Sequence, residues 1–449
     1  MTGETRVTDM TNGSVYRHIL TFMLPLMIGN LFQQFYNLVD SVVVGNYMGA
    51  DALAAVGTCG SLSYFFFALS SGLAIGIGIL ASQYFGAGDS EKIRATVVNS
   101  VFILVAAGVT VSMISYISAP QMLHLLNVPE SIFEMALTYL RVTSLGIVAV
   151  ALYNGVAYLL RAFGDSKSPL YFLIMACIIN IVLDIVFVMY MNMGVYGVAL
   201  ATVISQVFSF VVSTAYAWKK VEYFRIPREQ WKPDREIIRR CMSLGVPMAL
   251  QNALISISTM VLQGVVNEFG ETVMAAYTVV GKVEQLVHMP FSALGTAVTS
   301  FAGQNWGAGK TDRVKQGYKA SCLMVLVLSA LLIPAFLFFS GAMTGCFVKD
   351  ADVVAIGAKA LHIECLFYFA LGMIYIARGT LNGCGDASFS LINGMAEVVC
   401  RIVFASLLTR LAGVGYWGIW LTEGLTWTIT GLVCIWRYMQ GKWKHSSLK

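Results

Sequence analysis

Long apolar runs dominate this chain of 449 residues. A membrane-spanning helix needs about 20 consecutive apolar residues, because the hydrocarbon core of a bilayer is about 30 Å thick. Runs of this length, bounded by glycine, proline or charged residues, predict an all-α polytopic membrane protein with twelve transmembrane helices. The predicted spans are residues 19–48, 53–84, 95–117, 132–163, 170–191, 195–218, 237–269, 273–305, 317–339, 354–381, 391–411 and 416–438.

The composition excludes an ordinary soluble protein. The chain is 57% hydrophobic and only 12% charged, with a mean hydropathy of +0.73. Its nine cysteines are scattered without a CxxC motif, so we expect small buried hydrophobic side chains rather than disulfides or a zinc site. The five histidines do not cluster, and no metal centre is predicted. Residues 1–16 are polar and carry acids, unlike a cleavable signal peptide.

The sequence also contains an internal repeat. The motif QYFGAG at residues 83–88 recurs as QNWGAG at residues 304–309, and the Gly164-Asp165 pair recurs as Gly385-Asp386. Both separations are 221 residues, which indicates a duplication. Six spans in each half, an even number, predict two six-helix bundles in a parallel repeat. The predicted domains are an N-terminal bundle (1–218), a linker (219–236) and a C-terminal bundle (237–449).

Basic residues predict the orientation. In the twelve-span topology nearly all lysines and arginines outside the spans fall on one side, from Arg6 to Lys449, and the opposite loops hold little more than Lys349 and Arg410. The positive-inside rule therefore predicts that both termini are cytoplasmic. The net charge of +5 then reflects topology and does not indicate a nucleic-acid partner.

The first predicted span carries a polar stripe. Asn30, Gln33, Asn37 and Asp40 follow one another at spacings of three or four, so they share one helix face. A carboxylate inside a membrane helix is costly unless it faces a cavity, a partner or a cation, so Asp40 is a functional candidate. The alternative is an aspartate solvated by headgroups. Pro25 removes a backbone hydrogen bond and makes the same helix a candidate hinge.

The fifth predicted span carries a second acid. Asn180 and Asp184 lie four residues apart on one face of an otherwise apolar helix. Carboxylates combined with amide and hydroxyl oxygens suit Na⁺ or a shared proton. The alternative for Asp184 is a structural hydrogen bond between helices.

The repeat is not symmetric at these positions. At the 221-residue offset Asp184 corresponds to Ala405 and Asn180 to Arg401. Glu397 and Arg401, four residues apart, are predicted to form a buried ion pair, with a role in a substrate cavity as the alternative. The candidates for such a cavity are Gln33, Tyr36, Asn37, Gln251, Lys282, His288, Glu397 and Arg401.

The whole pattern resembles the MATE (multidrug and toxic compound extrusion) transporters. The motifs that carry the resemblance are LPLMIGNLFQQFYNLVDSVVVG in the first span, the QYFGAG and QNWGAG turns, RAFGDSKSP at residues 161–169 and NIVLDIVF with Asn180 and Asp184. The resemblance implies a V-shaped pair of bundles that exports organic cations or amphiphiles in exchange for H⁺ or Na⁺. It implies a bacterial inner-membrane protein in contact with lipids, with no cofactor beyond the coupling ion and no obligate protein partner.

Within that family the chain resembles the DinF-like branch, because the polar stripe of the seventh span is neutral. In that branch the positions that match Asp40, Asn154, Asn180, Asp184 and Thr202 line a cation pocket in the N-terminal bundle. The resemblance thus implies a candidate Na⁺ site at Asp40, Asn180, Asp184 and Thr202. Because Asp184 corresponds to Ala405 and Thr202 to Glu423 at the 221-residue offset, this pocket is expected in the first half alone.

Two other functions compete with efflux. A lipid-linked oligosaccharide flippase of related fold would favour several basic residues in a central cavity for its anionic cargo. The basic residues clearly within spans are expected to be only Lys282 and Arg401, with Arg141 and Lys359 nearer the ends. An intramembrane enzyme is disfavoured because the sequence shows no metal-ligand cluster and no Ser/His pairing on neighbouring helix faces.

Overall fold

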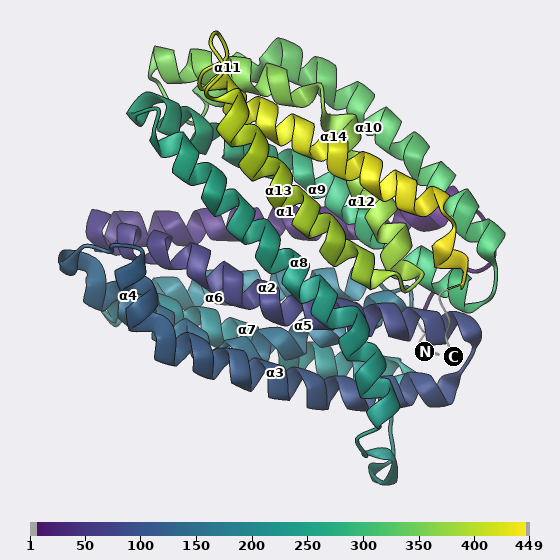
Figure 1. The fold of residues 1–449 in the computed structure, drawn as a ribbon. Helices are drawn as coiled ribbons and strands as arrows, with labels where there is room; N and C mark the ends of the chain where they lie inside the picture. Colours follow the sequence, from purple (N-terminus) through teal and green to yellow (C-terminus); the bar gives the residue numbers. More distant parts are fainter. Residues whose placement is uncertain (1–6, 446–449) are drawn as a thin grey trace. The chain divides into compact units, whose positions relative to one another are not determined.

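The computed structural model describes residues 7–445, and all regular structure in this range is helical (Figure 1). The predicted all-α fold is confirmed. Arg6 and Lys449, used in the topology prediction, lie outside the described residues. The first half contains α1 (Val15–Met48), α2 (Ala50–Ala87), α3 (Ser90–Leu125), α4 (Glu130–Leu145), α5 (Ile147–Ala162), α6 (Lys167–Ile185) with the π-helical turn η1 (Val186–Tyr190), and α7 (Gly194–Lys220). After the short turns η2 (Glu222–Phe224) and η3 (Arg228–Gln230) come α8 (Arg235–Asn267), α9 (Glu271–Gly307), α10 (Thr311–Gly345), α11 (Ala351–Cys365), α12 (Tyr368–Gly383), α13 (Ala387–Leu408), α14 (Trp417–Met439) and η4 (Lys442–His445).

The fourteen α-helices of the described residues account for the twelve predicted spans, because two of the spans are each built from a pair of helices. Nine described helices are long and apolar enough to cross a membrane, and two more spans are bent pairs, α4 with α5 at 44° and α11 with α12 at 52°. The remaining span is α9, which is 37 residues long and carries Lys282, Glu284 and His288 among its apolar residues. The chain is therefore a multi-pass membrane protein.

The chain divides into two compact units. Unit 1 comprises Met1–Asp9 and Leu24–Ala249, and unit 2 comprises Met10–Met23 and Leu250–Lys449. The chain passes from one unit to the other inside α1 and inside α8, and each of these helices contains a proline near that point, Pro25 in α1 and Pro247 in α8.

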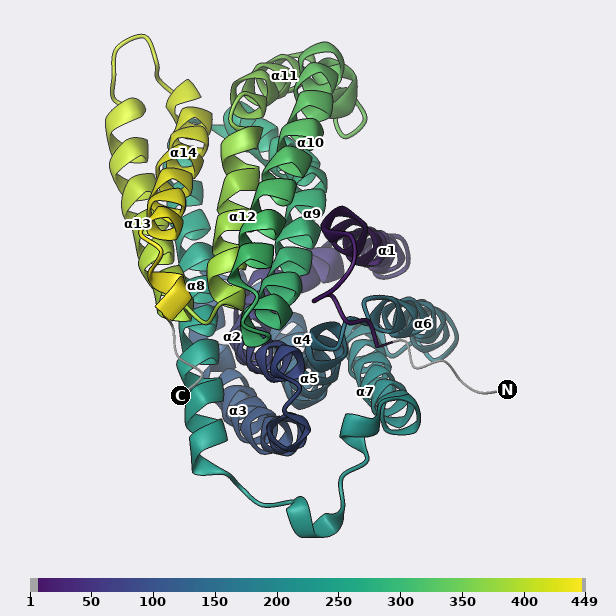
Figure 2. The same ribbon diagram turned by 90° about the vertical axis from the view of Figure 1, so that its right-hand side faces the viewer.

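The two units share one packing pattern. The pairs α2–α5, α3–α4, α5–α7 and α6–α7 pack in unit 1, and the corresponding pairs α9–α12, α10–α11, α12–α14 and α13–α14 pack in unit 2 (Figure 2). The breaks in the bent spans fall at Gly146 and Phe367, which are 221 residues apart. The repeat in the sequence is therefore a repeat in the fold.

Glycines at the turns follow the same spacing. Gly164 ends the turn after α5 with φ of 84°, and Gly385, 221 residues later, has φ of 89°. A side chain is strained in this left-handed region, and glycine is not. At Gly164 a Cβ would also overlap the Thr8 backbone, so the repeated Gly-Asp motif is explained by backbone geometry.

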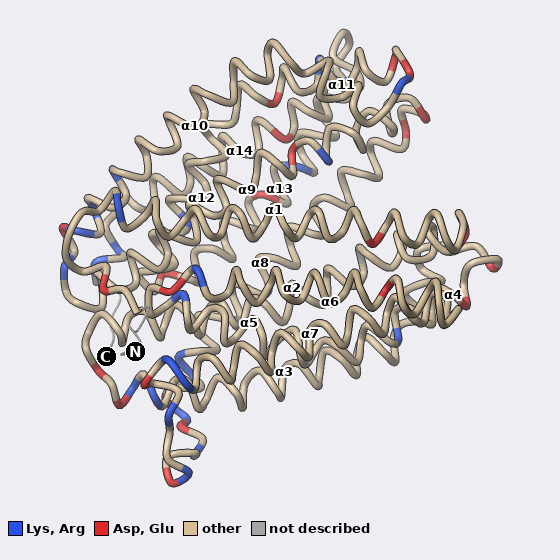
Figure 3. The backbone as a smooth tube through the Cα atoms, turned by 180° about the vertical axis from the view of Figure 1, so that it is seen from behind, with Lys and Arg blue, Asp and Glu red and all other residues tan. Residues whose placement is uncertain are grey.

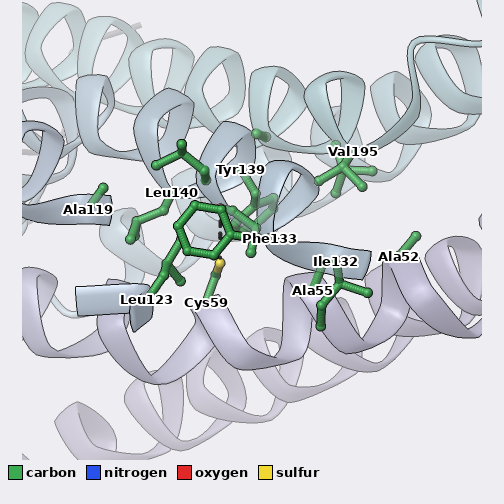
Figure 4. Packing of buried hydrophobic residues seen from close by; sticks show 14 of the residues in the cluster. Ala52, Ala55, Cys59, Ala119, Leu123, Ile132, Phe133, Tyr139, Leu140 and Val195 are labelled. Carbon is green, nitrogen blue, oxygen red and sulfur yellow. Dashed lines mark hydrogen bonds between the residues drawn. The ribbon is translucent and has the colours of Figure 1, made fainter. Parts of the chain in front are cut away.

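An apolar cluster fills one end of unit 1 (Figure 4). It is formed by buried residues of α1, α2, α3, α4, η1 and α7, including Cys59, whose thiol donates to the Ala136 carbonyl at 3.2 Å. Val44 and Val188 belong to this cluster, and each lies one helical turn beyond an acid, Asp40 or Asp184. The cluster therefore closes one side of the region that holds these two acids.

Within each unit, the loops predicted to be cytoplasmic lie at one end. In unit 1 the Thr8 amide donates to the Phe163 carbonyl, Arg94 pairs with Glu222 at 2.8 Å, and Arg240 donates to the Tyr84 hydroxyl. In unit 2 the Trp306 indole donates to the Trp443 carbonyl, and Arg437 pairs with Asp386 at 2.7 Å. Figure 3 shows lysine and arginine concentrated towards helix ends. The cytoplasmic location of these ends remains a prediction.

Two predictions from the sequence, on the basic residues within spans and on the cysteines, were wrong. Arg378 is a further basic residue inside a span, because it lies within α12 and reaches Glu397 at 3.7 Å. The cysteines are free but not all buried, because Cys346 at the end of α10 is exposed.

Candidate cation site

The two acids of unit 1 come together. Asp40 of α1 is half-buried, Asp184 of α6 is fully buried, and their carboxyl groups lie within hydrogen-bonding reach of each other. A carboxyl group donates a hydrogen bond to another only when it is protonated. This contact therefore requires one proton between the two acids or, without it, a cation to offset their repulsion.

Asp40 has further capacity to bind a ligand. Its Oδ1 atom is buried and accepts no hydrogen bond from any residue in the described part of the chain. A buried oxygen of this kind is costly to leave without a partner. A proton or a small cation bound at this oxygen would remove that cost.

Neutral oxygens lie beside the acids. The Asn180 side chain is fully buried and donates from Nδ2 to the Thr202 hydroxyl at 3.5 Å. The Thr202 hydroxyl donates to the Val198 carbonyl at 3.1 Å and also contacts the Tyr36 phenol. Three helices, α1, α6 and α7, thus bring together two carboxyl groups, an amide and two hydroxyl groups.

Asn154 is placed differently. It is half-buried on α5, the helix that packs against both α2 and α7. The structure gives it no hydrogen bond to the other four predicted site residues within residues 7–445. Of the remaining polar residues of the α1 stripe, Gln33 and Asn37 are exposed and Asn30 is half-buried.

The equivalent position in unit 2 holds an ion network. Arg401 of α13 lies 2.8 Å from Glu423 of α14 and 3.3 Å from Glu397, and its Nη1 donates to the Ser258 hydroxyl at 3.0 Å. Arg401 and Glu423 occupy the positions of Asn180 and Thr202 in the repeat. The contact between α6 and α7 in unit 1 is therefore a hydrogen bond, and the equivalent contact between α13 and α14 in unit 2 is a buried ion pair.

Unit 2 has its own pair of acids, which the sequence analysis did not bring together. Glu284 of α9 and Glu364 of α11 lie within hydrogen-bonding reach of each other, and one oxygen of each is buried without a donor in the described chain. Nearby, the His288 ring lies 3.0 Å from the Tyr375 hydroxyl. Neither acid has an acidic counterpart in unit 1, because positions 63 and 143 are serine and threonine.

The other predicted cavity residues are dispersed. Gln251 of α8 is buried against Gly394 of α13, and Lys282 is exposed on α9. Tyr36 is the one cavity candidate that the structure brings to the cation site. Helical periodicity could have shown this, because Tyr36 lies four residues before Asp40.

The fold and these clusters define a duplicated helical membrane protein of the twelve-span class. A family model described as MatE matches twice, over residues 25–186 and 247–407. The chain belongs to the MATE family of multidrug transporters.

The similar proteins agree with this assignment. The probable multidrug resistance proteins YpnP and YoeA of Bacillus subtilis are 31% and 30% identical over 443 residues, which cover 98% and 97% of this chain and 98% and 96% of theirs. A solved outward-facing multidrug resistance MATE transporter of the MOP superfamily matches with a TM-score of 0.91 and 23% identity over all of both chains. Its relatives are thus named as multidrug resistance proteins, and the chain shares the fold of a MATE transporter over its whole length.

Proposed function

We propose that this protein is a secondary active exchanger that moves cationic or amphiphilic organic compounds out of the cell in return for H⁺ or Na⁺. The observation that carries the proposal is the contact between Asp40 and Asp184 in unit 1. Asp40, Asn180, Asp184 and Thr202 bind the coupling ion, and Asn154 belongs to the same pocket. The protein is a multi-pass protein of the bacterial inner membrane with both termini in the cytoplasm.

Ion binding couples to the shape of α1. Asp40 and Pro25 lie in the same helix, and loading a cation at Asp40 removes the repulsion from Asp184. In this scheme α1 bends about Pro25 and displaces the bound compound to the outside. Similar transporters, at 23% identity, have been solved in straight and bent conformations, which supports the scheme.

The energy available is sufficient. One elementary charge that crosses 100 mV releases about 2.3 kcal/mol, which is worth roughly a fiftyfold concentration ratio. No chemical intermediate and no cofactor are needed. The coupling ion alone drives the cycle.

The flippase alternative is less well supported. An anionic pyrophosphate cargo needs basic side chains that are not already neutralised. In unit 2 the buried Arg401 and the half-buried Arg378 are both within ion-pair distance of Glu397, and Arg401 also pairs with Glu423. Their charge is therefore already balanced.

The test is transport by the purified full-length protein in vesicles, with a proton gradient and a sodium gradient imposed separately. One of the two gradients is expected to drive dye efflux, and Asp40→Asn is expected to abolish this drive while dye binding persists. The matched control is Asp51→Asn, which changes an exposed acid on α2 and should transport normally. Full gradient-driven efflux by Asp40→Asn would refute the exchanger proposal.

A further inference from the structure

The segment that connects the two halves is held in a defined position on unit 1. In the structure the linker is Val221–Asp234, because α7 extends to Lys220 and α8 begins at Arg235. The Tyr223 ring packs against Phe163 at 5.2 Å and against Phe85 at 6.2 Å, both at the ends of neighbouring helices. Arg225 donates to the Trp218 carbonyl at 3.0 Å and so caps the end of α7. The first part of the linker is therefore fixed to the bundle.

The second part of the linker returns along the side of α3. The Trp231 ring packs edge-to-face on Phe102 with centroids 6.5 Å apart. The Asp234 amide donates to the Asn99 side chain at 2.9 Å. Figures 1 and 2 both show this segment leaving the flank of the unit 1 helices.

The contact with Phe102 places Trp231 beside the exposed apolar surface of α3. Phe102 is the first large apolar residue exposed on α3, and Val105, Val109 and Met113 continue this surface along the helix. It lies twelve residues into α3, about 18 Å along the axis at about 1.5 Å per residue. Trp231, which is 46% exposed, therefore lies where the lipid-facing surface of α3 begins. Tryptophan is enriched at the boundary between headgroups and acyl chains in membrane proteins.

The linker region presents positive charge at that level. Two of its acids are paired, Glu222 with Arg94 at 2.8 Å and Glu236 with Arg240 at 2.6 Å. The Asp234 carboxylate accepts the Glu236 and Ile237 amides, and Glu229 is exposed. Basic residues still outnumber these acids in the segment from Lys219 to Arg240. A set of basic residues stays exposed without an ion pair to any described residue. These are Lys219, Lys220, Arg228, Lys232, Arg235 and Arg239.

We propose that the linker and its basic flanks form a docking surface for anionic phospholipid headgroups of the surrounding leaflet. The phosphate groups of these lipids complement the unpaired lysines and arginines, and Trp231 lies between headgroups and acyl chains. Each basic residue near a membrane surface contributes about 1 kcal/mol of attraction, or about fivefold in affinity. The surface concentrates anionic lipid beside α3 and α8, whatever ion or compound the protein carries.

The test measures lipid at Trp231. Full-length protein is reconstituted in phosphatidylcholine vesicles with increasing fractions of phosphatidylglycerol that has brominated acyl chains, which quench nearby tryptophan. Subtracting the signal of Trp231→Phe isolates Trp231. The expected quenching saturates at a low fraction of anionic lipid, and Arg228→Gln/Lys232→Gln raises the half-saturating fraction by about 25-fold, about fivefold for each charge.

The control is Lys319→Gln/Lys442→Gln, which removes the same charge from exposed residues of unit 2 and should leave the half-saturating fraction unchanged. Should the linker variant unfold, Lys219→Gln/Lys220→Gln provides the same comparison. The proposal is overturned if quenching of Trp231 rises in proportion to the phosphatidylglycerol content of the vesicles and does so equally in the native protein and in Arg228→Gln/Lys232→Gln. It is also overturned by reversal of quenching by millimolar inorganic phosphate, which would indicate a site for free anions instead of lipid.

Discussion

At the scale of single residues, the repeat shows one contact built in two ways. Asn180 with Thr202 in unit 1 and Arg401 with Glu423 in unit 2 join equivalent helices. The pair in unit 1 carries no charge, whereas the ion pair in unit 2 balances its own charges. This difference supports a cation pocket in unit 1 and a structural role for the network in unit 2.

The network predicts a specific stability effect. Arg401→Asn leaves Glu397 and Glu423 buried without their main partner, and removing one member of a buried ion pair typically costs about 3–5 kcal/mol. Thermal unfolding of the detergent-solubilised variant should therefore occur at a clearly lower temperature. Adding Glu423→Thr, which restores the residues of unit 1, should recover much of the loss. A double variant as unstable as the single variant would contradict this explanation.

At the scale of helices, α1 and α8 are the two helices in which the chain changes unit. Both helices contain a proline close to the point where the chain changes unit. The first half of α8 also approaches α2 very closely, because a Cβ at Gly76 would overlap the backbone of Gly245. Small residues allow such approach between membrane helices.

Pro25 is predicted to affect the rate of transport turnover rather than the affinity for the transported compound. Pro25→Ala restores a backbone hydrogen bond in α1 and makes bending more costly. We expect turnover in vesicles to fall about tenfold, the effect of about 1.4 kcal/mol on a barrier, with little change in dye affinity measured at equilibrium. Equal losses of affinity and turnover would instead assign Pro25 to the binding site.

The α2–α8 crossing is tested by two alanine substitutions in the same helix. Gly76→Ala inserts a methyl group into a backbone contact and should destabilise the protein by about 1–3 kcal/mol. Gly57→Ala has open space around it and should be neutral or stabilising, because alanine favours a helix over glycine by about 1 kcal/mol. Similar unfolding temperatures for both variants would exclude a tight contact at Gly76.

At the scale of the whole molecule, the predicted orientation can be read from one native cysteine. Cys346 is exposed at the end of α10, the end opposite to the basic Lys310–Lys315 region. With both termini in the cytoplasm, Cys346 faces outwards. A membrane-impermeant maleimide added to intact cells should label the native protein and not Cys346→Ser. Labelling that appears only after the cells are permeabilised would show that the orientation is the opposite of the predicted one.

The sequence by itself determined the helical membrane fold, the number of spans and the repeat. Apolar length, helical periodicity and recurring turn glycines are local properties, and a bilayer leaves few structures that satisfy the backbone. The same periodicity placed Asn30, Gln33, Asn37 and Asp40 on one face of α1, and it placed Asn180 with Asp184.

Only the tertiary structure decided which of these groups meet across helices. It joined Asp40 to Asp184, added Tyr36 through Thr202, paired Glu284 with Glu364, and placed Gln33 and Asn37 at the surface. It also drew Arg378 into the Arg401 network and laid Trp231 on Phe102. Such contacts depend on the rotation of each helix against its neighbours, which packing sets and local sequence does not encode.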